Sequence, residues 1–371
     1  MYAGMEESEP TRRPRKLSRR ARYGLVAGVL ALSAAAVLMP VLVLADDDSE
    51  CRTVPAETAA LADDPEAATR ALDPGQGLAG IGEVRTLLGT QGTPLCAGKD
   101  GSEAAGRVLL AATTGARQTH TLPMARVVHA TVIALGREAD GRMTAGLEPY
   151  VARVLAAYIG DFTQHPISDV EGPAFVASKV DEHLVADYPY PGEAHAVITR
   201  YASGRRALVR NLAGNPESFA VLYDADRAHL AYYLERLDDE AANPTTTHGI
   251  EGTETDLYRI GELTGLLMRA RAFHAESGTI DLDTFDRAVL RHSRGTYRAA
   301  AHQVTSYPPA GTIATRAAVK ADAKDFMDGH AQILAPYDAW ARERGIDPVH
   351  ARQARSAIQK GYNRELRDVA W

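Results

Sequence analysis

The most unusual group of chemically active residues lies between His248 and Asp256, where the chain reads HGIEGTETD. It combines the imidazole of His248 with three carboxylates, those of Glu251, Glu254 and Asp256. Paired carboxylates can act as general acid and base on a glycosidic bond, and carboxylates also bind hard cations. These four residues are therefore the candidate catalytic residues of a hydrolase.

The same nine residues have a simpler structural interpretation. Thr253 is a suitable N-cap for a helix that follows it, and Glu254 and Asp256 would then meet the positive end of the helix dipole. The two glycines of the segment would shape the turn before the helix. We favour this interpretation, so the sequence favours a protein that is not an enzyme and keeps the hydrolase as the alternative.

A row of four arginines is a second candidate site. Arg287, Arg291, Arg294 and Arg298 recur at helical spacing and would share one helix face. Guanidinium groups in such a row can bind carboxylates or phosphates, so they are candidates for binding a partner protein or polymer. The alternative is a solvated face whose arginines pair with acids of a neighbouring helix.

Other motifs that would define a reaction are missing from the sequence. Its twelve histidines form no His-Glu-x-x-His pattern, and no close pair of cysteines is present for zinc. The sequence contains no P-loop, no dinucleotide-binding fingerprint and no G-x-S-x-G. Residues 281–286 alternate acids as a calcium loop does, but the glycine and glutamate that such a loop needs are absent. We predict neither a cofactor nor a metal.

The longest apolar run covers residues 23–45 and contains no charged side chain. As a helix it would span about 33 Å, enough to cross a hydrocarbon core of about 30 Å. Seven basic residues precede it and three aspartates follow it. By the positive-inside rule, residues 1–22 are expected to be a disordered cytoplasmic tail, and the remainder to lie outside the cell membrane.

Two alternatives to a retained transmembrane helix remain open. Residues 43–45 fit a signal-peptidase site, and two arginine pairs in the tail are reminiscent of a twin-arginine signal. The length of the basic region and of the apolar run favours the anchor. Within that segment, Gly24 and Gly28 have the spacing that lets two membrane helices pack closely, so a homodimer is one expectation.

The chain has two cysteines, Cys51 and Cys96. With the expected topology both lie in an oxidising compartment, which favours a disulfide between them. Such a bridge closes a loop of about 45 residues and would stabilise the fold by about 4 kcal/mol in the chain-entropy model. The alternative is a bridge between the Cys51 residues of two copies.

The charge of the exterior part argues against one class of partner. The chain carries 41 Lys and Arg and 48 Asp and Glu, of which 7 and 3 lie in residues 1–45, so the remainder has a net charge of −11. A strongly acidic domain repels polyanions, so we do not expect a nucleic-acid partner. The excess of arginine over lysine and the abundance of alanine are typical of a GC-rich bacterial genome.

Helical periodicity dominates the chain after the apolar segment, which predicts an all-α multi-helix bundle. Residues 46–80 are acidic and rich in alanine and proline, so a linker is expected there, with a short helix around 56–72. Residues 81–371 are expected to form the helical domain, with a subdivision near 240–250, and no convincing strand pattern occurs. The expected helices are 124–136, 149–159, 175–184, 193–212, 216–237, 253–276, 283–305, 313–344 with a break near Gly329 or Pro336, and 348–368.

Together these features predict a single-pass bacterial membrane protein. Its exterior helical domain is expected to bind or scaffold an envelope partner, which is either a protein or a polymer. The hydrolase with carboxylates between residues 251 and 256 is the alternative, and discriminating the two requires knowing whether these carboxylates face each other in a concave site.

Overall fold

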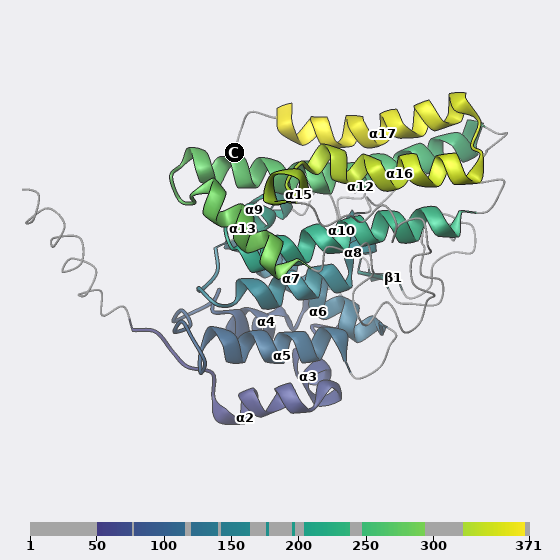
Figure 1. Ribbon diagram of the computed structural model, residues 1–371. Coiled ribbons are helices and arrows are strands. Elements are labelled where there is room, and N and C mark those ends of the chain that lie inside the picture. The colour runs from purple at the N-terminus through teal and green to yellow at the C-terminus, as the bar shows by residue number, and fades with distance from the viewer. Residues whose placement is uncertain are drawn as a thin grey trace, which may run out of the picture. The chain divides into compact units, whose positions relative to one another are not determined.

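The computed structural model describes residues 50–75, 78–115, 120–139, 142–163, 176–177, 195–196, 204–237, 247–293 and 322–367. Within these residues the chain is almost entirely helical, which confirms the predicted all-α class (Figure 1). The principal helices are α3 (Pro65–Leu72), α4 (Ile81–Leu88), α5 (Ser102–Thr114), α6 (Leu122–Val132), α7 (Glu148–Ala157), α9 (Arg205–Leu212), α10 (Pro216–Arg236), α12 (Thr247–Glu276), α13 (Leu282–His292), α16 (Gly329–Arg344) and α17 (Pro348–Arg367). Shorter helical pieces are α2 (Ala56–Ala59), the 3₁₀-helix η1 (Ala60–Asp63), the π-helix η3 (Ile133–Glu138), α8 (Ile159–Thr163) and α15 (Ala323–Phe326).

Several helix ends follow directly from local sequence. The side chain of Asn215 accepts hydrogen bonds from the backbone N–H groups of Glu217 and Ser218, at 3.0 and 3.1 Å, so it caps α10 as expected. Gly345 has a left-handed backbone with φ of 64° and ends α16, and Pro348 then begins α17. The break predicted near Gly329 is also present, because α16 begins at that residue.

Two helix starts differ from the expected positions. α12 begins at Thr247 rather than at Thr253, so Thr253 is not its N-cap and the segment expected as a turn is helical. Each of the two glycines there costs about 1 kcal/mol relative to alanine in a helix, but neither prevents the helix from starting before it. α13 begins at Leu282 and is capped by Asp281, whose carboxylate accepts from Thr284 N–H at 2.9 Å. It ends at His292, short of the predicted end at residue 305.

Two short strands overturn two predicted helices. β1 (Val176–Ala177) pairs antiparallel with β2 (His195–Ala196). Helices were expected over 175–184 and 193–212, but in the second range only α9, from Arg205, is helical among the described residues. Short apolar runs fit strand and helix equally well, so periodicity could not decide between them. The helix expected over 149–159 ends at Ala157, and a separate short helix, α8, follows from Ile159.

Cys51 and Cys96 form the predicted intrachain disulfide, with their Cα atoms 4.9 Å apart. Backbone hydrogen bonds hold the same two segments together, from Arg52 N–H to Pro94 O and from Cys96 N–H to Arg52 O, both at 2.9 Å. From Cys51 onward the segment predicted as a linker packs on the helical body, because its side chains contribute to the core. The buried ones are Val54, Ala68 and Leu72.

The buried apolar side chains form two clusters. Along α10 they belong to the larger cluster up to Ala225 and to the smaller one from Leu230. Asp226, Arg227 and His229, all at most 3% exposed, occupy the interval. On α12 the buried Glu262 lies in a similar interval between the two clusters. We call these four residues the buried polar layer.

α12 and α17 pack more extensively than any other pair of described elements, and Figure 1 shows α16 and α17 running beside α12. Glycines permit this close crossing. A Cβ added at Gly261 would lie 2.3 Å from the carbonyl oxygen of Ile358, and one at Gly361 would lie 1.9 Å from that of Tyr258. Backbone therefore meets backbone where these helices cross.

None of the helices in the described part of the chain is long and apolar enough to cross a bilayer. The predicted tail (1–22) and the predicted transmembrane segment (23–45), with Gly24 and Gly28, lie outside the described residues.

Candidate functional site

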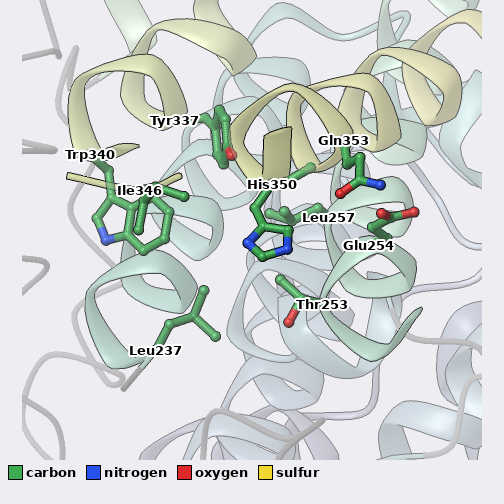
Figure 2. Close-up of a pocket in the computed structure, with 10 residues that line it drawn as sticks. Leu237, Thr253, Glu254, Leu257, Tyr337, Trp340, Ile346, His350 and Gln353 are labelled. Carbon is green, nitrogen blue, oxygen red and sulfur yellow. The ribbon is translucent and has the colours of Figure 1, made fainter. Parts of the chain in front are cut away.

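A small pocket lies where α12, α16 and α17 meet the end of α10 (Figure 2). Its volume is about 360 Å³, including the space open to solvent at its mouth. Most of its lining is apolar or aromatic. The lining residues are Leu237, Thr253, Glu254, Leu257, Tyr337, Trp340, Ile346, His350, Gln353 and Ala354.

Helical spacing places these side chains on common faces. Tyr337 and Trp340 are three residues apart on α16, and His350 and Gln353 are three apart on α17. The turn at Gly345 folds α17 back beside α16, so the two faces meet. In Figure 2 the ring of His350 lies between Trp340 on one side and Gln353 on the other.

The pocket has an apolar side and a polar side. The phenol of Tyr337 donates a hydrogen bond to Ala351 O at 3.0 Å, and burial raises its pKa, so the group stays neutral. Trp340 Nε1 and His350 Nδ1 are buried and have no hydrogen-bond partner within the described structure. Glu254 is half-buried and is the carboxylate among the described lining residues.

The two candidate acid–base residues whose side chains are described, Glu254 and Asp256, are not brought together. Glu254 lines the pocket, but Asp256 is buried away from it against α10 and accepts a hydrogen bond from Tyr233 Oη at 3.1 Å. Arg259 Nη1 also lies 3.6 Å from the Asp256 carboxylate. Glu251 and His248 lie on the first turns of α12, and the structure does not describe their side chains. A facing pair of carboxylates is therefore absent from the described part of this pocket.

The arginine row is described only at its start. Arg287 and Arg291 are exposed on α13, where Arg287 donates to Thr284 Oγ1 at 3.3 Å. Arg294 and Arg298 lie outside the described residues. The two described arginines thus remain accessible to a partner.

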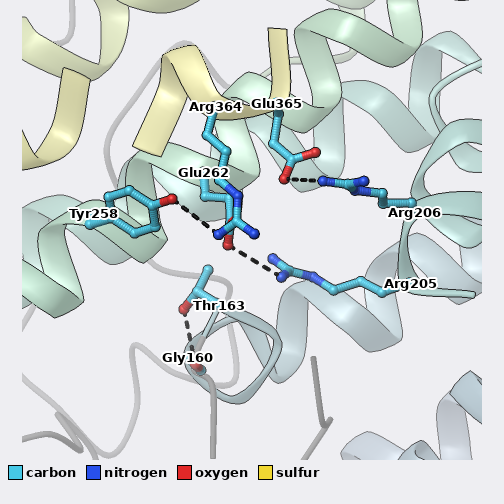
Figure 3. A network of polar contacts seen from close by, with 8 residues as sticks. All are labelled: Gly160, Thr163, Arg205, Arg206, Tyr258, Glu262, Arg364 and Glu365. Atoms are coloured by element: carbon cyan, nitrogen blue, oxygen red, sulfur yellow. Dashed lines mark hydrogen bonds and ion pairs between the residues drawn. The ribbon is translucent and has the colours of Figure 1, made fainter. Parts of the chain in front are cut away.

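A network of charged side chains connects α9, α12 and α17 (Figure 3). The carboxylate of Glu262 on α12 lies 3.7 Å from Arg205 Nη1 and 3.1 Å from Arg364 Nη1. Arg206 forms a second pair with Glu365 at 3.0 Å, and burial raises the pKa of the Glu365 carboxyl. Both glutamates are nearly fully buried, whereas Arg206 and Arg364 remain partly exposed, so these pairs tie the three helices together at the edge of the interior.

On α10, two side chains of the buried polar layer have pKa values that burial shifts. Asp226 accepts a hydrogen bond from Thr264 Oγ1 at 2.5 Å, and burial raises its pKa to about 7. His229 lies one turn further, and burial lowers its pKa to about 4. Burial thus favours the neutral form of each group: His229 is neutral above about pH 4, and Asp226 is protonated below about pH 7.

Arg227 is the largest fully buried side chain of this layer. It donates to Asp224 Oδ1 at 3.2 Å and to Gln332 Oε1 at 2.8 Å. Its guanidinium also lies over the rings of Tyr223 and Phe326, with 5.1 and 4.8 Å to the ring centroids. It therefore fixes how α10, α15 and α16 pack against one another.

The sequence held one overlooked signal for the polar layer. Asp226 lies four residues after Leu222 and four before Leu230, so it occupies the apolar face of its own helix. The pocket had no such signal, since its aromatic residues follow ordinary helical spacing.

No protein-family model matches this chain, and no curated protein or solved structure matches it. Its described part defines an all-α protein with a buried polar layer and a small, largely apolar pocket between helices.

Proposed function

We propose that the protein is a membrane-anchored binding domain of the bacterial envelope. Residues 23–45 hold it in the cell membrane with the N-terminus in the cytoplasm. The helical body from Cys51 onward lies outside and binds a partner through the pocket between α12, α16 and α17. The pocket is the single observation that carries the binding role, because it is concave, largely apolar and equipped with a few polar groups.

Two features support the exterior location. The apolar segment carries its basic residues on the N-terminal side, as the positive-inside rule requires. The disulfide between Cys51 and Cys96 is typical of proteins outside the reducing cytoplasm.

The location is tested by fractionating cells that produce the full chain and then adding protease to cells stripped of their wall. We expect a membrane-bound protein whose large C-terminal part is digested. Protection of that part would refute the orientation. Release of a soluble protein beginning near residue 46 would show that the segment is a cleaved signal instead. A variant in which the seven basic residues are replaced by serine should lose the uniform orientation.

The binding role is tested by crosslinking the full chain in intact cells with a reagent that does not cross the membrane. We expect one defined envelope adduct. Ala354→Trp, which fills the pocket, should abolish it, whereas Arg287→Glu with Arg291→Glu should leave it in place. If only the double arginine variant abolished the adduct, the partner would bind at α13 instead of the pocket. If neither change affected the adduct, the partner would bind at neither surface.

A further inference from the structure

The size of the pocket restricts what it can hold. Pockets for small molecules and cofactors range from about 300 to 1,000 Å³. The volume of this pocket reaches about 360 Å³ only when the space open to solvent at its mouth is counted. The pocket is therefore too small to enclose a whole cofactor, and one bulky aliphatic or aromatic side chain is the largest group that we expect it to take.

The walls of the pocket match such a side chain. Leu257 and Ile346 provide aliphatic surface, and Tyr337 and Trp340 provide aromatic rings. All four are buried in the free body. Aromatic pockets of this kind are where anchor side chains of protein partners gain most of their binding energy.

The negative charge at the pocket favours a cationic residue next to the partner's apolar side chain. Glu254 contributes the negative charge at the pocket, and Figure 2 shows it on the same side as the Gln353 amide. The chain beyond residue 45 carries a net charge of −11, so it attracts cationic segments from a distance. A lysine or arginine beside the anchor would meet a carboxylate that is already partly withdrawn from water.

Two ring nitrogens supply hydrogen bonds for a main chain. Trp340 Nε1 is a donor, and the Nδ1 atom of His350 is a donor or an acceptor depending on its tautomer. Both atoms are buried without a partner in the described structure. A peptide segment offers both carbonyl and N–H groups next to its side chain, whereas a lipid tail offers neither.

We propose that the pocket binds a protein segment in which a bulky apolar side chain lies within about two residues of a lysine or arginine. This inference rests on the proposed binding function and names the feature of the partner that the pocket recognises. The apolar side chain enters between α16 and α17, and the cationic group pairs with Glu254.

The test uses nine-residue glycine–serine peptides with acetylated and amidated ends and the full chain in detergent micelles. The parent peptide has a central leucine and a lysine two residues away. One variant has alanine in place of leucine, and another has glutamate in place of lysine.

Titration by nuclear magnetic resonance should detect binding of the parent peptide at about millimolar affinity or tighter. Loss of the leucine should weaken binding at least about tenfold, because a buried leucine is worth that much. Equal binding of all three peptides would overturn the proposal.

Variants of the protein locate the interaction. Glu254→Lys should reverse the preference, so that the glutamate peptide binds more tightly than the lysine peptide. Glu83→Lys, an equal charge change at an exposed residue of α4, should leave the preference unchanged. Ala354→Trp should remove binding of the parent; if that variant does not fold, the charge reversal decides alone. An unchanged preference in Glu254→Lys would refute the pairing.

A lipid is the competing occupant that the same titration can reveal. Phosphatidylcholine that displaces the parent peptide, together with no effect of peptide charge, would overturn the proposal. Failure of this inference can be distinguished from failure of the proposed function. Peptide binding to a chain that proves to be cytoplasmic would refute the location only. A crosslinked envelope adduct without any peptide preference would refute this inference only.

Discussion

Asp226 and His229 lie one turn apart on α10 and shift their pKa values in opposite directions because of the same burial. The pKa of Asp226 rises from 3.8 to about 7, so between these values the folded state binds more protons than the unfolded state. The free energy of unfolding then falls as pH rises. The pKa of His229 falls from 6.5 to about 4, so the unfolded state binds more protons there and the free energy of unfolding rises with pH.

These two effects should cancel between about pH 4.5 and 6.5. Relative to wild type, Asp226→Asn should therefore make stability rise with pH, by up to about 1.4 kcal/mol per pH unit. His229→Gln should make it fall. Urea unfolding of the full chain across this pH range measures both slopes. The double variant is the control and should return to the wild-type slope; slopes of equal sign in the single variants would contradict the assignment.

Arg227 is expected to matter far more for stability than an arginine at the surface. Arg227→Met leaves Asp224 without its buried cation, and loss of one partner of a buried pair costs about 3–5 kcal/mol. Arg355 pairs with Asp338 at 2.9 Å, but both side chains are more than a third exposed. Arg355→Met should cost less than about 1 kcal/mol. Urea unfolding compares the two variants, and similar losses would show that burial does not determine the difference.

Glycines govern the pairing of α12 with α17. Gly361→Ala places a methyl group against backbone that cannot move aside as a flexible side chain does. We expect it to destabilise the fold by at least about 1–3 kcal/mol, the usual cost of overpacking. Gly82→Ala in α4 is the matched control, because nothing lies within 4 Å of the added carbon. It should be neutral or stabilise by up to about 1 kcal/mol. A thermal melt that ranks Gly361→Ala at or above Gly82→Ala would contradict this packing.

The sequence predicted helix ends most accurately where a capping residue, a glycine or a proline marks them. Asn215 with Pro216 begins α10, and Gly345 with Pro348 separates α16 from α17, because caps act within one turn. The start of α12 was misplaced because Gly249 and Gly252 are typical of a turn, whereas the helix begins before both of them, at Thr247. The strands β1 and β2 were missed because their pairing joins residues about 20 positions apart.

The candidate site was predicted only in part. Glu254 was chosen for acid–base chemistry and does line the pocket, but Asp256 points to a different helix because two residues turn an α-helix by about 200°. Trp340 and His350 come from separate helices and gave no sign of meeting. Their proximity depends on how α17 folds back, which local patterns do not encode. The arginine row does not share one helix face as expected, because α13 ends at His292, before Arg294. Partner binding by its arginines and the membrane role of segment 23–45 remain predictions.

The disulfide should account for a measurable share of the stability of the whole body. Replacing Cys51 and Cys96 by serine removes a bridge across 45 positions, and we expect the free energy of unfolding to fall by about 4 kcal/mol. Urea unfolding with and without dithiothreitol measures this. The reductant should reproduce the loss in wild type and should not affect the double variant. A variant as stable as wild type would show that the native contacts around residue 96 suffice.

The same bridge also decides how the body would respond to mechanical tension. A pull applied from the N-terminal side enters at Cys51 and passes through the sulfur atoms directly to Cys96. Residues 52–95, with α2, α3 and α4, are therefore outside the path of the force. In a single-molecule stretching experiment these residues stay folded back as a closed loop, and about 150 Å of extra length should be released only after reduction. If the partner pulls on the body, the tension bypasses this segment and loads the helices that begin with α5.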